Sequence, residues 1–188
     1  MNGNGSADAP GYPELPRMLE AAASPGIWES NMTDRIVPYL VQEWVARYGS
    51  TPSGGELVEV RVDGFSYLFD IGPDRLIAAW GISQGRFPGS RDKDRMRGHP
   101  KSAGRFYHRG HAIPHRLGGG TDINIAVQIG SVNMGPFRAL EMRAVENPGS
   151  LYFTYWMYEP DSNSQVASRV QQGLLRCGLQ PEIKTSSN

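Results

Sequence analysis

The chain is poor in cysteine and has no long apolar run, and each absence removes a class of protein. Its 188 residues contain one cysteine, Cys177, so an intrachain disulfide framework is excluded and a reducing compartment is favoured. No window approaches 18 consecutive apolar residues, so we expect no membrane-spanning helix and no membrane partner. The opening MNGNGSADAPGYPELP has neither a basic segment nor an apolar run, which predicts no secretory signal peptide. We therefore expect a cytoplasmic protein, or one exported without a signal peptide.

Two common catalytic arrangements are also missing from the sequence. There is no Gly-x-Ser-x-Gly, the turn that presents the nucleophilic serine in many hydrolases. Cys177 has no histidine near it in sequence, so we interpret it as a small packing residue rather than as a nucleophile.

The charge that is present is unevenly distributed. The formal net charge is zero, yet the segment from Arg86 to Arg116 holds nine Lys or Arg against two Asp. Such a run forms either a solvated surface or a surface that attracts phosphate, and charge alone does not decide between them.

The order of the expected elements indicates an α+β fold with an antiparallel sheet core. The first fifty residues predict two helices, and the segment 56–71 then alternates β-forming residues around Asp63-Gly64, which predicts a hairpin. We expect further strands at 75–83 and 151–158, with a helix between them that starts at Asn133. The segment 164–178 fits either a helix or a strand. This order, which runs from helices to strands, a loop, a helix and a strand, does not form βαβ units.

All four histidines fall within the basic segment, at His99, His108, His111 and His115. Arg-Gly-His occurs twice, at 97–99 and at 109–111. The last three histidines have a spacing that could supply zinc ligands, although Gly110 and Pro114 disfavour a regular helix there. From this segment alone, three interpretations stay open: a surface loop, a zinc site and the active site of an enzyme.

Downstream of the second Arg-Gly-His, three amides and a carboxylate fall within a span of 18 residues, namely Asn124, Gln128, Asn133 and Glu141. Asn133 opens the expected helix and Glu141 lies eight positions later, so both can fall on one helical stripe. An amide oxygen and a carboxylate on one side can hold a hard cation such as Mg²⁺, directly or through water. Taken alone, the same two residues also fit a helix cap and a solvated helix position.

Taken together, these residues resemble the DNA/RNA non-specific endonucleases, which carry the ββα-metal, or His-Me finger, site. His-Arg-Gly-His-Ala-Ile-Pro at 108–114 matches the Asp-Arg-Gly-His element of that family, except that His108 stands where the family has Asp. The glycine loop, the amide element and the metal-binding turn with its helix match Leu-Gly-Gly-Gly at 117–120, Asn-Ile-Ala-Val-Gln at 124–128 and Asn-Met-Gly-Pro-Phe-Arg-Ala-Leu-Glu at 133–141. The clear match covers 105–143, and residues 1–50 have no counterpart.

The resemblance implies a ββα-metal motif and a set of site residues. It makes His111 the general base that activates water, Asn133 the direct metal ligand, and Glu141 the residue that holds metal-bound waters. Arg109 would support the site, and His108 would lie beside the metal in place of the acid. The implied substrate-binding residues are Arg105, Arg116, Asn124, Gln128, Arg138 and Arg143.

The implied function is sequence-non-specific hydrolysis of DNA and RNA with one Mg²⁺, or Mn²⁺, while the basic segment holds the phosphate backbone. Two alternatives stay open. One is a catalytically degenerate module that only binds nucleic acid. The other is the same nuclease acting as a toxin that a protein inhibitor controls.

The chain is expected to divide into a disordered leader (1–12), a helical extension (13–50), the nuclease domain (51–180) and a frayed tail (181–188). The extension would offer the surface for an inhibitor or for a homodimer.

Overall fold

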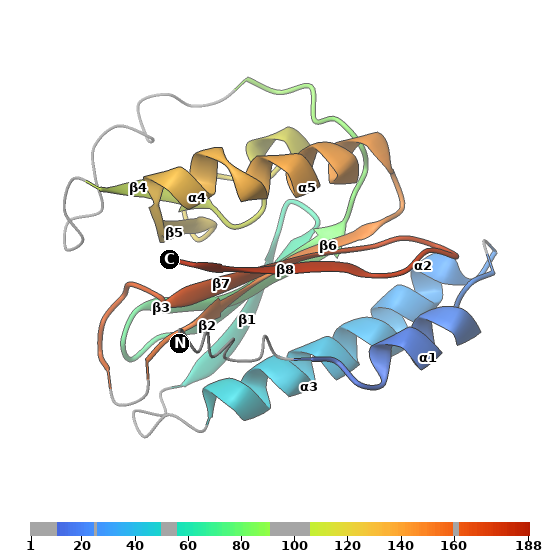
Figure 1. Ribbon diagram of the computed structural model, residues 1–188, viewed down its shortest axis with the longest axis horizontal. Helices are drawn as coiled ribbons and strands as arrows, with labels where there is room; N and C mark the ends of the chain where they lie inside the picture. The colour runs from blue at the N-terminus through green and yellow to red at the C-terminus, as the bar shows by residue number, and fades with distance from the viewer. Residues whose placement is uncertain (1–10, 25, 50–55, 91–105, 160–161) are drawn as a thin grey trace, which may run out of the picture.

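A six-stranded antiparallel sheet separates two layers in the computed structural model of the chain (Figure 1). The structure describes residues 11–24, 26–49, 56–90, 106–159 and 162–188. The sheet has the order β1-β2-β3-β6-β7-β8. Its strands are β1 (Leu57–Val62), β2 (Phe65–Asp70), β3 (Arg75–Ile82), β6 (Leu151–Met157), β7 (Arg169–Leu175) and β8 (Glu182–Ser187). The expected α+β class with an antiparallel sheet is confirmed.

The first hairpin of the sheet has the turn that its sequence predicts. Asp63 and Gly64 join β1 to β2 with φ values of 52° and 84°. Two consecutive positive φ values match the right-handed twist of the flanking strands, and Asp-Gly is the pair that adopts them readily. The hairpin predicted at this turn is therefore confirmed, as is the strand predicted at 75–83.

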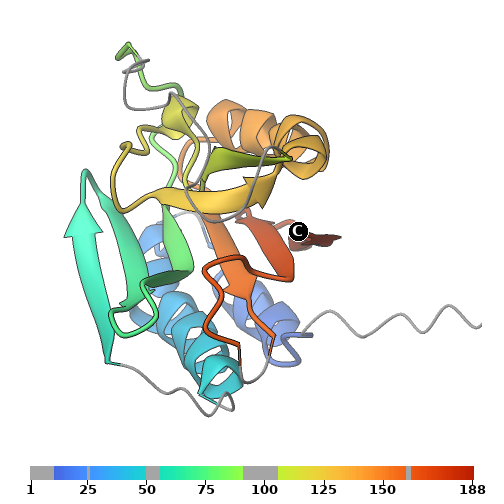
Figure 2. The ribbon, with the colours of Figure 1, turned by 90° about the vertical axis from the view of Figure 1, so that its left-hand side faces the viewer.

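Three helices and a π-helical turn cover one face of the sheet (Figures 1 and 2). They are α1 (Leu15–Ala21), α2 (Trp28–Asn31), the turn η1 (Met32–Ile36) and α3 (Val37–Tyr48). Trp44 of α3 is fully buried, and its ring stacks at 6.0 Å on that of Tyr155 in β6. The described residues of the segment 13–50 therefore form one layer of the fold, sharing a hydrophobic core with the sheet, rather than an appended extension. A partner bound there would meet the outer side of this layer, because the apolar side is covered.

Tyr12, expected in the disordered leader, belongs to this core. It is 7% exposed, and its hydroxyl donates to Gln171 Oε1 and accepts from Trp44 Nε1 at 2.8 Å. Burial raises the pKa of Tyr12 well above its ordinary value, so the hydroxyl keeps its proton. The leader prediction is therefore wrong at Tyr12, and residues 1–10 of it lie outside the described part of the chain.

The frayed tail expected at 181–188 is also wrong, because β8 occupies most of it. This strand pairs with β7 over six positions, from Glu182 opposite Leu174 to Ser187 opposite Arg169. The last residue, Asn188, donates its side-chain amide to the carbonyls of Val127 and Ala167 at 2.9 and 3.0 Å. The polar sequence is that of an edge strand, which buries little side chain and is held by main-chain bonds.

The other face of the sheet carries a two-stranded antiparallel sheet and two helices (Figure 1). These elements are β4 (Tyr107–His111), the 3₁₀ turn η2 (His115–Leu117), β5 (Ile125–Ile129), α4 (Gly130–Met134) and α5 (Pro136–Glu146). Phe137 and Leu140 of α5 are buried in a second hydrophobic core on this face. The carbonyl of Phe137 accepts a 3.0 Å hydrogen bond from Gln172 Nε2 of β7, which fixes α5 on the sheet.

The single helix expected from Asn133 onward is two helices. Gly135 separates α4 from α5 with φ −106° and ψ −100°, outside the helical region. The following Pro136 disfavours a helical residue before it and itself suits the first turn of a helix. Asn133 and Glu141 therefore do not share a stripe of one helix. In the described ranges, no helix has the length and apolar character needed to cross a membrane.

Candidate active site

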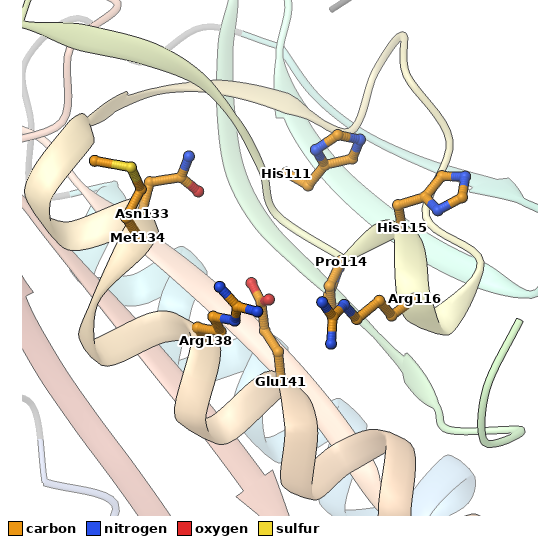
Figure 3. A pocket seen from close by; sticks show the side chains of 8 residues that line it. All are labelled: His111, Pro114, His115, Arg116, Asn133, Met134, Arg138 and Glu141. Atoms are coloured by element: carbon orange, nitrogen blue, oxygen red, sulfur yellow. The ribbon is translucent and has the colours of Figure 1, made fainter. Parts of the chain in front are cut away.

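A cavity of about 380 Å³ lies where β4, η2, α4 and α5 meet (Figure 3). Its walls are formed by His111, Pro114, His115, Arg116, Asn133, Met134, Arg138 and Glu141. Five of these were expected as site residues from the sequence, namely His111, Arg116, Asn133, Arg138 and Glu141. They come from four different elements, so the folded chain, and not their spacing alone, brings them together.

His111 ends β4, and the close pairing of β4 with β5 holds it at the cavity. It is 7% exposed and stands opposite Ile125 in the pairing. A side chain at the preceding Gly110 would lie 2.3 Å from Gln128 Oε1 on β5. Only glycine lets the Gln128 side chain approach the backbone at position 110 so closely. This explains structurally why the middle residue of this Arg-Gly-His is glycine.

Asn133 and Glu141 approach the cavity from separate helices, and their side chains point into the same space as His111 (Figure 3). One amide oxygen and one carboxylate suit Mg²⁺, which keeps several waters and takes one or two protein ligands. The residues present therefore fit the cation that the resemblance implies.

A zinc site is not supported. Among the described residues, which include His108, His111 and His115, no three His, Cys, Asp or Glu are grouped to hold a metal. Two of these histidines do lie close together, with ring centroids 6.5 Å apart for His111 and His115.

His115 is the cavity residue that the sequence interpretation missed as part of an active site. Its ring meets that of His111 at 79° and lies edge-on to Phe87 at 5.7 Å. The one sequence signal for it is the four-residue spacing of His111 and His115, which also fits a pair of zinc ligands. Its place depends on η2, which turns the chain back after Pro114, and short turns of this kind are not visible as a periodic pattern.

His108 and Arg109 do not line the cavity. Side chains alternate along a strand, so His108 lies on the opposite face of β4 from His111. A side chain at Gly130 would stand 2.7 Å from the His108 ring, so this imidazole is packed against the start of α4. His108 was expected beside the metal, but the structure does not bring it to the cavity that Asn133 and Glu141 line.

Asn124, expected to bind substrate, instead fastens the loop after β4. It is 1% exposed, and its Oδ1 accepts from the amide of Ile113 at 2.6 Å. Its Nδ2 donates to the carbonyls of Ile113 and Gly120 at 2.7 and 2.9 Å. The amide is thus engaged inside the protein, and its effect on the site is to hold the segment that carries His115.

Replacing Asn124 with alanine should lower the free energy of unfolding by about 1–3 kcal/mol, because it leaves buried backbone groups of the loop without partners. Urea unfolding measures the effect. Thr121→Ala, in the same loop, is the control and should change stability by less than about 0.5 kcal/mol. Equal stability of the two variants would contradict the fastening role.

Two further expected substrate-binding residues point elsewhere. Gln128 is fully buried on β5, and its amide atoms have no hydrogen-bond partner in the described part of the chain. Arg143 of α5 forms a 2.8 Å ion pair with Glu182, which also pairs with Arg176 at 2.7 Å. Neither residue lines the cavity, because one is enclosed under the hairpin and the other ties α5 to β8.

The rest of the expected basic surface is only partly described. Arg105, the first Arg-Gly-His at 97–99 and the cations between Arg91 and Lys101 lie outside the described residues. Arg116 and Arg138 are exposed on the cavity wall, where Glu141 is the one acid. Two guanidinium groups against one carboxylate give the side chains of the wall a net positive charge, which favours an anion.

Comparison with known proteins adds no relative to these observations. No protein-family model matches the chain, and a search of the curated proteins finds no match.

Proposed function

We propose that the protein is a metal-dependent nuclease that hydrolyses phosphodiester bonds of DNA and RNA without reading sequence. One observation carries the proposal, which is that His111, Asn133 and Glu141 line a single cavity. In the sequence they are separated by 22 and 8 residues. The antiparallel β4–β5 pair followed by α5 is compatible with a ββα-metal motif, and the resemblance of the 105–143 segment to the non-specific endonucleases supports the same chemistry.

The side chains of the cavity can perform complementary parts of a hydrolysis. His111 accepts the proton of the attacking water, as a general base that lines the cavity in which the phosphate would bind. Arg116 and Arg138 contact phosphate oxygens, which are the same in every nucleotide and therefore give no sequence preference. Asn133 and Glu141 would hold Mg²⁺, which when bound neutralises charge on the phosphoryl group. Neither the arginine contacts to phosphate nor the bound metal requires or excludes a 2′-hydroxyl, so both DNA and RNA can serve as substrate.

Removal of the metal gives the direct test of this function. Purified protein should degrade plasmid DNA and single-stranded RNA in Mg²⁺ or Mn²⁺, and excess EDTA should stop both reactions because Asn133 and Glu141 then hold no cation. Gel electrophoresis of the products, followed by restoration with added Mg²⁺, measures the effect. Salt-dependent gel shifts without product at any metal concentration would instead show a module that only binds nucleic acid.

The chemistry is the same whether the nuclease acts alone or as a toxin. In the second case an inhibitor protein would have to close the cavity or displace the substrate. The corresponding measurement is plasmid cleavage with and without the purified inhibitor protein, which should stop the reaction without any other factor.

A further inference from the structure

The cavity contains a second imidazole to which the proposed hydrolysis gives no task. We propose that His115 is the general acid that protonates the leaving 3′ oxygen. This inference rests on the proposed nuclease function and adds a catalytic residue to it.

The other groups of the cavity wall leave His115 as the suitable proton donor. Pro114 and Met134 have no exchangeable side-chain proton, and the guanidinium groups of Arg116 and Arg138 do not give up theirs. Glu141 and Asn133 are assigned to the cation, and His111 accepts the proton of water. Histidine loses and regains a proton readily near neutrality, which is what a general acid requires.

The backbone that carries His115 is held in place by hydrogen bonds, and its ring packs edge-on against Phe87. The η2 turn closes through hydrogen bonds from Leu117 N to the Pro114 carbonyl at 2.9 Å and from Gly118 N to the His115 carbonyl at 3.0 Å. Asn124 fastens the chain just before it, at Ile113. A fixed backbone keeps the imidazole at the cavity wall, so that the turn need not rearrange when His115 donates to substrate, which is the advantage of preorganised catalytic groups.

The two imidazoles lie close enough together to serve one phosphoryl group. Their centroids are 6.5 Å apart. A general base and a general acid each act over a heavy-atom distance of roughly 2.6–3.2 Å, so a phosphoryl group bound in the cavity beside both rings can have the attacking water at His111 and its leaving oxygen at His115. Both rings border the same cavity, and Figure 3 shows them side by side above Glu141 and Arg116.

Atoms, electrons and protons balance in the proposed step. Water forms a new bond to phosphorus as His111 takes its proton, and the bond between phosphorus and the 3′ oxygen breaks. The oxygen leaves with the bond pair and receives the proton of His115, giving a 3′-hydroxyl and a 5′-phosphate. Afterwards His111 loses a proton to solvent and His115 regains one, so that no oxidant or further reactant is needed.

The test compares two leaving groups. One substrate is an oligodeoxynucleotide, whose 3′ alkoxide needs a proton to leave. The other is thymidine 5′-p-nitrophenyl phosphate, whose p-nitrophenolate leaves without one. We expect His115→Ala and His115→Gln to lower kcat on the oligonucleotide by about 10²–10⁴-fold, while the p-nitrophenyl ester is hydrolysed at close to the parental rate. Glutamine keeps a polar side chain of similar reach, so it covers the case in which alanine loosens the turn.

Each other outcome has a distinct meaning. An equal loss on both substrates would overturn the general-acid role and leave His115 as a phosphate contact, which weaker oligonucleotide binding in a fluorescence-anisotropy titration would also reveal. Unchanged kcat on the oligonucleotide would overturn any catalytic role. His111→Ala is the matched comparison, since loss of the base should slow both substrates. If the parent cleaves neither substrate in Mg²⁺ or Mn²⁺, the proposed nuclease function fails, and with it the premise of the inference.

Discussion

Replacing His111 with alanine is expected to lower the rate of DNA cleavage by about 10²–10⁴-fold, the contribution of a positioned general base. DNA binding should change little, because the cationic contacts of the cavity come from Arg116 and Arg138. Single-turnover nicking of supercoiled plasmid in Mg²⁺ measures the chemical step. Anisotropy of a labelled duplex in the presence of EDTA measures binding separately.

His108→Ala is the informative comparison for this result. It removes the same side chain from the same strand, three positions earlier, but on the face of β4 that packs against Gly130. We expect a far smaller loss of cleavage from His108→Ala than from His111→Ala. Comparable losses would mean that His108 takes part in the chemistry, as the family pattern implies for this position. Full cleavage by the His111 variant would eliminate the proposed mechanism.

The sequence predicted which segments form the cavity better than it predicted which side chains reach it. His111, Asn133 and Glu141 could be selected because their residue types and spacing resemble a known pattern. Asn124 and Gln128 belong to the same pattern, yet both are buried, one in the loop and the other behind Gly110. An amide that holds backbone and an amide that meets substrate have the same donors and acceptors. Spacing alone therefore cannot separate them.

The break between α4 and α5 shows that two residues can line one cavity without sharing a helix. The sequence argument put Asn133 and Glu141 on one helical stripe, which requires a continuous helix. The structure ends α4 at Met134 and starts α5 at Pro136. Both residues nevertheless line the cavity, because the two helices approach it from different directions (Figure 3).

The strands were predictable where local signals were strong. Asp63-Gly64 specifies its own turn, so the first hairpin followed from the sequence. The segment 164–178 fitted helix or strand by its residues, and the structure makes it β7 because it pairs with β6 on one side and β8 on the other. Whether such a segment becomes helix or strand is decided by pairing with segments distant in sequence, and local propensity carries no information about that pairing.

The fold also contains buried charge that the sequence did not single out. Asp70 at the end of β2 is fully buried and accepts a 2.5 Å hydrogen bond from the hydroxyl of Tyr48 on α3. Arg75, its cross-strand neighbour, is 1% exposed and lies 4.6 Å over the ring of Tyr158. Burial and the hydrogen bond to Asp70 raise the pKa of Tyr48 to about 12, against the opposing effect of Arg75. Tyr48 therefore stays protonated and links the helical layer to the sheet.

Replacing Asp70 with alanine should lower the free energy of unfolding by about 1–3 kcal/mol, because it leaves the buried Tyr48 hydroxyl without its acceptor. The amide of Gly72, which donates to Asp70 Oδ1 at 3.1 Å, would lose its acceptor as well. Urea unfolding followed by tryptophan fluorescence is suited to the measurement, since Trp44 lies in the same layer. Glu59→Ala removes an exposed acid from the neighbouring strand and should cost less than about 0.5 kcal/mol. If Asp70→Ala were no more destabilising than Glu59→Ala, the Tyr48–Asp70 hydrogen bond would contribute nothing to stability, and the attachment of α3 to the sheet would rest on apolar packing alone.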